Sequence, residues 1–171
     1  MAICKLANDI TRASSCGYQL AEIVNVYMAN FDDVTVSVDT GETQITAITM
    51  ATGTTVYKIE PVKNSASFTD ELVVADNGAK YRTATVNFGI SGAYSTTQKG
   101  NLDALSLGRY FVVLQLADGS YIGLGRLAAL EASVATLQGG SEANGLTVTL
   151  TANLAESALP LSSDAIEDIT D

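Results

Sequence analysis

The sequence predicts a mostly β protein built from antiparallel strands. Turn-forming stretches such as Asp39-Thr40-Gly41, Asp118-Gly119 and Asn144-Gly145 recur at short intervals along the chain. The segments between the turns have the length of strands and are rich in β-branched and aromatic residues, as strands are. The expected strands are Ile23–Ala29, Thr35–Val38, Ile45–Met50, Val56–Glu60, Phe68–Val74, Lys80–Phe88, Tyr110–Leu116, Tyr121–Leu124, Leu127–Leu137 and Leu146–Asn153.

A single substantial helix interrupts the strand pattern, over residues 95–107. Ser95 stands three residues before Gln98 as in a capping box, and Gly108 can take the left-handed conformation after the last turn. Two leucines inside the segment fall on one face, which must pack on a sheet for the helix to persist. The next segment, Tyr110–Leu116, is apolar on both faces apart from one glutamine, so we expect a central strand lying beneath this helix.

The segments Phe68–Val74 and Lys80–Phe88 are expected to form a long hairpin joined at Asp76-Asn77-Gly78. Neither face of this hairpin is strongly apolar, and isolated two-stranded ribbons are marginally stable in water. The hairpin is therefore either a flexible flap or a ribbon that pairs with the same hairpin of neighbouring subunits.

The clearest strand is Leu146–Asn153, in which apolar and polar residues alternate without interruption. Leu146, Val148 and Leu150 belong on a core face, and threonines occupy the positions between and after them. We expect the apolar residues to pack beside Leu127–Leu137. The threonine face is short, uncharged and able to form hydrogen bonds.

Composition indicates one folded domain of low surface charge. The chain has 171 residues, of which 47% are hydrophobic and 16% charged, a balance that excludes intrinsic disorder. Its 19 acidic and 9 basic residues give a net charge of -10, which disfavours stable binding to nucleic-acid phosphates. We expect a β-rich domain over residues 1–160, followed by an acidic C-terminal arm over residues 161–171.

The N-terminal stretch MAICKLANDI lacks the pattern of a signal peptide, and no apolar run is long enough to cross a bilayer. We therefore expect a soluble protein that is synthesised in the cytoplasm and has no membrane binding of its own. Two cysteines, Cys4 and Cys16, are expected to be reduced and buried in such a compartment.

The sequence contains no recognisable catalytic site, cofactor site or metal site. Histidine is absent, so the usual base of a nucleophilic triad and the commonest metal ligand are both missing. The stretch Ile122–Leu127, IGLGRL, lacks the third glycine of a dinucleotide fingerprint and favours a strand bend. We expect neither a cofactor nor enzymatic activity.

The stretch NFDD, from Asn30 through Phe31 and Asp32 to Asp33, has two interpretations. Its oxygens could bind Ca²⁺, but the ligand spacing of an EF-hand is absent. A capped turn, in which Asn and Asp side chains accept hydrogen bonds from nearby backbone N–H groups, is favoured.

The chain ends with the acidic stretch DAIEDITD, in which Ile166 and Ile169 stand three residues apart. One interpretation is a solvated acidic tail. The other is an arm, in which Leu159 and Leu161 flank a proline that holds the chain extended, and the isoleucine pair docks on a neighbouring subunit.

The order of these elements resembles virion proteins of Bacteroides phages, crAss-like phages included, of the tail-tube or tail-ring kind. The phrases that carry the resemblance are VYMANFDDV, ITAITMATGTTVYKIE, KYRTATVNFGI, GRYFVVLQLADGSYIGLGRLAAL and NGLTVTLTANLAESALPL. Together with the expected helix before GRYFVV, they span nearly the whole chain.

The resemblance implies an antiparallel β-barrel or sandwich of tail-tube type, flanked by one helix and carrying a long protruding hairpin. It implies a structural protein that closes with its own copies into a ring, of six copies in a tail tube or twelve in a short tail, around a channel for DNA. Other partners would be adjacent tail, neck or portal-side virion proteins, and DNA would pass only transiently. The localisation would be the virion tail.

Two groups of contact residues follow from this resemblance. Ring contacts are expected on the hairpin, at Phe68, Leu72, Val74, Tyr81, Thr83 and Thr85. Contacts to the next ring are expected at Asn30, Phe31, Asp32, Asp33, Leu159, Leu161, Ile166 and Ile169. The threonine face would then meet a neighbour or the channel.

The alternative function is a head-decoration or adhesion module of a virion, which binds a capsid or a host glycan. Exposed aromatic residues in the loops would favour that alternative, but the chain has no Trp and its turns consist mostly of small residues.

Overall fold

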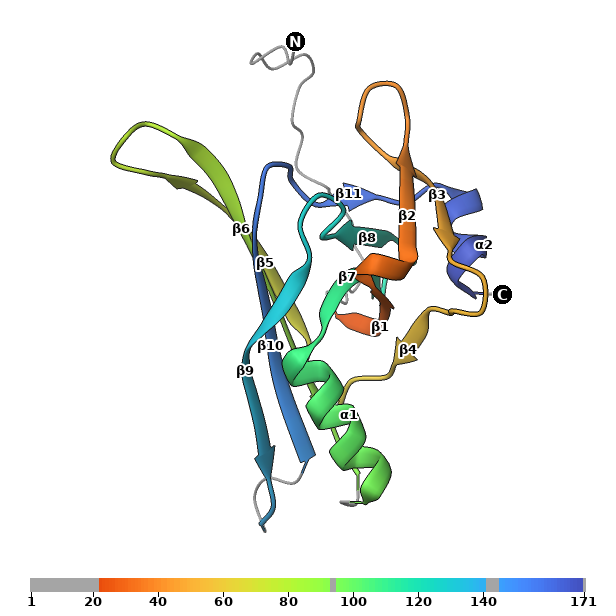
Figure 1. Ribbon diagram of the computed structural model, residues 1–171, viewed down its shortest axis with the longest axis vertical. Coiled ribbons are helices and arrows are strands. Elements are labelled where there is room, and N and C mark those ends of the chain that lie inside the picture. The colour runs from red at the N-terminus through yellow and green to blue at the C-terminus, as the bar shows by residue number, and fades with distance from the viewer. Residues whose placement is uncertain (1–21, 93–94, 141–144, 171) are drawn as a thin grey trace, which may run out of the picture.

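The computed structural model describes residues 22–92, 95–140 and 145–170 (Figure 1). Cys4, Cys16 and Asn144, which figured in the sequence-based expectations, lie outside the described residues. The elements in chain order are β1 (Ile23–Asn30), η1 (Phe31–Asp33), β2 (Val34–Val38), β3 (Ile45–Met50), β4 (Tyr57–Ile59), β5 (Ser67–Val74), β6 (Lys80–Ile90), α1 (Thr96–Leu107), β7 (Arg109–Leu116), β8 (Tyr121–Leu124), β9 (Leu130–Gln138), β10 (Gly145–Leu154), β11 (Leu159–Pro160) and α2 (Ser163–Thr170).

The fold is mostly β, as predicted, and its strand ladders are antiparallel. The main sheet runs in the order β11–β8–β7–β9–β10–β6–β5, and β1 lies on the other side of β7 with β4 beside it. Strand β7 meets β9 only at Arg109 and Tyr110, so the two halves of the sheet are joined along a short ladder. Among the described residues the ends of the sheet, β4 and β5, do not pair with each other, and the sheet therefore stays open rather than closing into a barrel.

The main core lies between the two halves of this curled sheet. Strands β1 and β7 face strands β6 and β10 across it, and Leu105 of α1 closes one end. The residues on this core face are almost completely buried, and they include Val26, Val112, Phe88 and Leu150. Leu146, Val148 and Leu150 lie in this core beside β9, as the alternating pattern predicted.

A second core explains why β1 and β7 are apolar on both faces. The alternate residues of these strands, such as Tyr27 and Phe111, point away from the main core. The β2–β3 hairpin, β11 and helix α2 cover them. The central position of β7 is thus confirmed, since it pairs with β1 on one side and with β8 and β9 on the other.

Helix α1 begins and ends close to the predicted bounds. The hydroxyl of Ser95 accepts a hydrogen bond from the N–H of Gln98, which confirms the predicted cap. The expectation for Gly108 was wrong, because its φ of -82° is extended; the Tyr110 side chain and the Ala104 carbonyl crowd the space where a side chain would stand. The helix also packs on β9 and β10 rather than over β7.

Helix α2 corrects the expectation for the C-terminal segment. Residues 163–170 form a helix on β3 of the same chain, with Ala165 and Ile169 buried in the second core. The Asp168 carboxylate accepts a hydrogen bond from the N–H of Ile48 at 2.8 Å, and the Ser162 hydroxyl accepts one from the N–H of Ala165. The described part of the chain therefore has two α-helices that flank the sheet, and residues 163–170 are part of the domain rather than an arm extending from it.

Strand β9 begins three residues later than the predicted strand Leu127–Leu137. Gly125 has a φ of +90°, a conformation that L side chains rarely adopt, and Leu127 is exposed. After this bend the chain continues along the same side of β7: β8 pairs with residues 112–115 of β7, and β9 pairs with Arg109 and Tyr110. It agrees with the interpretation of IGLGRL as a strand bend.

Candidate functional site

The outer face of strands β5, β6, β10 and β9 is a continuous surface made mostly of small polar side chains, which we call the threonine wall; it also carries two valines, one tyrosine and two glutamates. Its residues alternate with the buried residues of the main core, and they stand opposite one another in the strand register. The row Thr69–Thr85–Thr151 and the row Ser67–Asn87–Thr149 each cross three strands. The remaining members are Glu71, Val73, Tyr81, Thr83, Thr147, Asn153, Glu131, Val134 and Thr136.

Side-chain hydrogen bonds tie the strands of the threonine wall together. The Thr149 hydroxyl donates to the Asn87 amide oxygen at 2.5 Å, and the Thr83 hydroxyl donates to the Asn153 amide oxygen at 3.0 Å. Asn87 in turn lies 3.5 Å from the Ser67 hydroxyl. Because cross-strand pairs of this kind stabilise a sheet, the wall has a structural role as well as an exposed surface.

The threonine wall carries no basic residue. The structure describes its four strands completely, and their basic residues, Lys80 and Arg82, stand at positions that alternate with the wall residues. The only charges that these four strands place on the wall are the carboxylates of Glu71 and Glu131. Arg109 of β7 stands opposite Glu131 at the edge of the wall and lies 3.5 Å from its carboxylate. Hydroxyl and amide groups bind water, but they do not neutralise phosphate.

The β5–β6 hairpin extends beyond the rest of the sheet (Figure 1). Its base is part of the body, since Ala84, Val86 and Phe88 of β6 are fully buried in the main core. The expectation that neither face of the hairpin is strongly apolar was therefore wrong for the base. Beyond Arg82 the ribbon has no core against it, and we call residues 71–81 the overhang.

An ion pair marks the point where the overhang leaves the body. Arg82 donates to the Asp70 carboxylate at 2.6 Å and to the Asp70 carbonyl at 2.8 Å. The second carboxylate oxygen of Asp70 accepts a hydrogen bond from the N–H of Ala158 at 2.9 Å, which links the hairpin to the segment before β11. Sequence reasoning missed this clamp, because its partners Arg82 and Ala158 lie 12 and 88 positions from Asp70 in the chain.

The six predicted ring-contact residues fall on opposite faces of the hairpin. Tyr81, Thr83 and Thr85 belong to the threonine wall. Phe68, Leu72 and Val74 lie on the other face, where Phe68 packs against the main core and Leu72 and Val74 are exposed. These residues therefore form two surfaces rather than one.

The NFDD stretch forms η1 and is held by Arg109 at the start of β7. Arg109 lies 3.5 Å from the Asp32 carboxylate and 3.5 Å from that of Glu131, and its guanidinium stacks 5.2 Å from the centre of the Phe31 ring. Asn30 donates to the Asp33 carboxylate at 3.3 Å. The turn is confirmed, but Asn30 donates to a side chain instead of capping backbone N–H groups.

The predicted C-terminal contacts to another ring lie mostly inside the chain's own fold. Leu159, Leu161 and Ile169 are buried in the second core, and Ile166 is partly buried against it. They are not free to dock on a neighbour while the fold is intact. Asn30, Phe31, Asp32 and Asp33 remain near the surface, although Arg109 holds two of them.

The ionisable groups form structural contacts rather than an acid–base pair. Hydrogen bonds, first from the Thr43 side chain and then from the Gln44 and Thr43 backbone, lower the pKa of Asp39 below its ordinary value. Burial raises the pKa of Tyr110, whose hydroxyl donates to the Ala104 carbonyl. These shifts accompany a turn and a helix end, so they do not mark a catalytic site.

Surveyed over the described residues, no cluster of three or more His, Cys, Asp or Glu side chains could hold a metal ion. Within the same part of the chain, no helix is both long enough and apolar enough to span a membrane. Every buried side-chain nitrogen and oxygen there has a hydrogen-bond partner.

The main surface features of the described chain are thus the threonine wall, the overhang and the unpaired outer edge of β5. No family model matches the chain, and comparison with curated proteins and with solved structures finds no significant match.

Proposed function

We propose that the chain is a non-enzymatic structural protein of a phage virion, which assembles with its own copies into a ring of the tail and forms a channel for DNA. The threonine wall is the observation that carries this proposal. A channel for DNA needs a hydrated surface that offers no cations to phosphate, and the wall has hydroxyl, amide and carboxylate groups but no Lys or Arg. The resemblance to tail-tube and tail-ring proteins points the same way.

The edges of the threonine wall support assembly into a ring. In the described chain, β5 pairs with β6 alone, and β9 beyond Glu131 pairs with β10 alone. Exposed strand edges favour pairing with another chain. Pairing of β5 in one copy with β9 in the next would join the walls of six or twelve copies into a continuous barrel, which removes the open edges.

The first experiment is to measure the assembly of the purified full chain by mass photometry and negative-stain electron microscopy over a range of concentrations. We expect rings or short tubes with an open centre. A chain that stays monomeric at all concentrations and binds a glycan or a capsid surface would contradict the proposal and favour a decoration or adhesion module.

A second experiment tests whether the threonine wall faces the channel. Thr136 and Thr147 are both exposed and stand opposite each other on the wall, and Thr52 and Thr55 are an exposed pair on the connection between β3 and β4. We expect assemblies of T136K/T147K to retain short duplex DNA at low salt, with a steep loss as salt rises, because each ring would add many lysines to the channel.

The matched control T52K/T55K adds the same charge away from both the wall and the overhang. It should assemble without retaining DNA. Retention by the control, with none by T136K/T147K, would place the wall outside the channel and refute this part of the proposal.

A further inference from the structure

The face of the overhang opposite the threonine wall is apolar and unpartnered within the chain. Leu72 and Val74 are 58% and 57% exposed, although they continue the same face of the sheet that buries Phe68 in the main core. Lys80 stands opposite Val74 on this face. Because Arg82 and Asp70 neutralise each other at the base, the exposed part of the face is two aliphatic side chains with one positive charge.

The body of the chain carries a groove of about 300 Å³ with complementary properties. The groove lies between β2 and the bend before β9. Its apolar lining includes Phe31, Val34, Phe111 and Leu127, and Arg126, which is bound to Glu156, also lines it. In the described chain β2 pairs only with β3, so the outer edge of β2 is also free for strand pairing.

Acidic residues lie beside this groove, since Asp32 follows Phe31 of its lining and Glu42 lies 3.7 Å from Arg126. Asp32 and Glu42 have side chains that are 77% and 70% exposed, and each lies 3.5 Å or more from its nearest basic group. The two arginines beside them, Arg109 and Arg126, also bind Glu131 and Glu156, so the acidic groups exceed the basic ones here. The face of the overhang that carries Leu72, Val74 and Lys80 therefore matches the apolar part of the groove, and Lys80 matches the acidic groups beside it.

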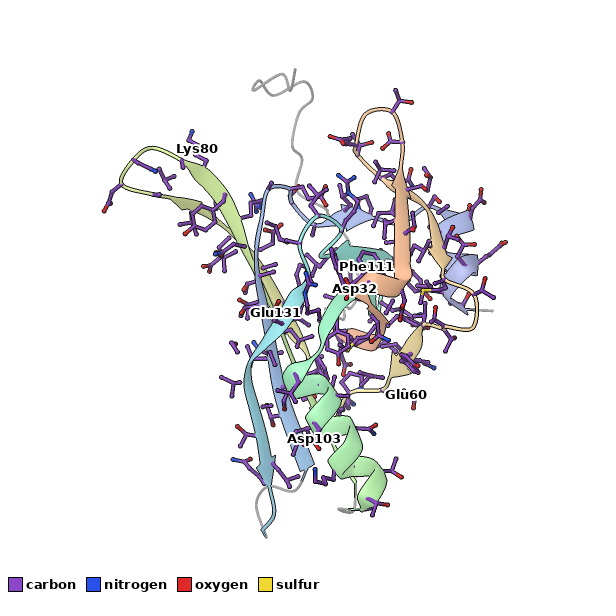
Figure 2. All side chains as sticks on the ribbon, in the orientation of Figure 1. Asp32, Glu60, Lys80, Asp103, Phe111 and Glu131 are labelled. Atoms are coloured by element: carbon purple, nitrogen blue, oxygen red, sulfur yellow. The ribbon has the colours of Figure 1, made fainter. Side chains whose placement is uncertain are left out.

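The chain does not fill this groove with its own hairpin. Figure 2 shows Lys80 on the overhang and Asp32 and Phe111 in the middle of the body, well apart from it. Because the two surfaces are separate on one chain, one copy can offer the overhang while the next offers the groove. Such a head-to-tail contact repeats from copy to copy and closes into a ring if the rotation allows it.

We propose that the overhang of one copy docks in the groove of the next copy, with Leu72 and Val74 on the apolar lining and Lys80 at the acidic rim. This contact rests on the proposed function, since it requires self-assembly, and it adds a specific pair of surfaces to that assembly. It also explains why two large aliphatic residues stand exposed on a ribbon that has no core of its own.

The first test compares L72D/V74D with the wild type and with the control V62D/L107D, which also replaces two exposed aliphatic residues. We expect L72D/V74D to raise the concentration needed for half-assembly at least about tenfold, because burial of two aliphatic side chains would be lost. Its melting temperature as a monomer should match the wild type, since neither residue is buried. The control should assemble normally.

The second test identifies the docking site directly. A photoreactive benzoylphenylalanine in place of Leu72 is activated in the assembled state, and the cross-linked peptides are mapped by mass spectrometry. We expect cross-links between chains to residues 31–36 and 125–127. The groove variant L127D should weaken assembly to a similar extent, since Leu127 is already 53% exposed in the monomer.

The outcomes separate this inference from the proposed function. If L72D/V74D assembles like the wild type, or if the cross-links map only to other surfaces, the docking contact is refuted while ring assembly stands. If the wild type forms no assembly at any concentration, both the ring and the contact are refuted.

Discussion

Replacement of Ile169 by alanine tests whether the C-terminal segment belongs to its own fold or to a neighbour. Ile169 is 9% exposed and packs in the second core with the residues of β3 and β11. Isoleucine-to-alanine changes in cores cost about 2–5 kcal/mol. Because α2 is a peripheral eight-residue helix that can shift to fill part of the space, we expect the lower end, about 2–3 kcal/mol.

The assay is thermal and urea unfolding of the full chain at a concentration where it is monomeric. For a chain of this size, 1 kcal/mol shifts the melting temperature by about 2–4 °C, so I169A should melt about 4–12 °C below the wild type. The neighbouring variant I166A is the control, because Ile166 is only partly buried and should cost less. An I169A monomer of unchanged stability that fails to assemble would refute the structural reasoning and restore the docking arm.

Three further outcomes are expected. The change Phe88→Ala should cost about 3–5 kcal/mol in urea unfolding, because this fully buried ring lies at the base of the hairpin in the main core; a cost below about 1 kcal/mol would mean that the base is not core. The change Asp70→Asn should weaken the contact with Arg82 and increase proteolysis within the hairpin by about tenfold, with little effect on overall unfolding; unchanged proteolysis would show that the ion pair does not anchor the overhang. The change Thr43→Val should raise the pKa of Asp39 toward 3.8 in an NMR titration, because the Thr43 hydroxyl bond is its main cause of lowering. The lowered pKa of Asp39 stabilises the folded state at pH values above its ordinary pKa of 3.8. In the wild type this stabilisation is lost as the pH falls below 3.8 and through the folded-state pKa. The stabilisation should be smaller in the variant.

Local sequence patterns predicted the elements well where a short stretch decides the structure. The bounds of β3 and β8 agree with the predicted strands, and the alternation in β10 correctly separated Leu146, Val148 and Leu150 from the threonines. The Ser95 cap and the bend at Gly125 were also found from sequence. In each case the relevant interaction joins residues only a few positions apart.

Long-range packing decided two features that were predicted wrongly, the C-terminal segment and the base of the β5–β6 hairpin. The C-terminal stretch has the composition of an acidic tail, but in the fold it is a helix whose Ala165 and Ile169 pack on the apolar side of β3. On β6 the core-side face changes from Lys80 and Arg82 to the apolar Ala84, Val86 and Phe88, and these three are buried because β10 pairs with this part of the strand.

What the sequence alone determined is the β-rich class, the turns, the helix start and the uncharged character of the threonine face. What only the tertiary structure decided is which residues share a surface. The sheet brings four strands together into the threonine wall, and it separates the predicted hairpin contacts into a polar face and an apolar face. The physical reason is that alternation assigns a residue to one of two faces, but the partner strands decide which face is covered and how far along the ribbon the cover extends.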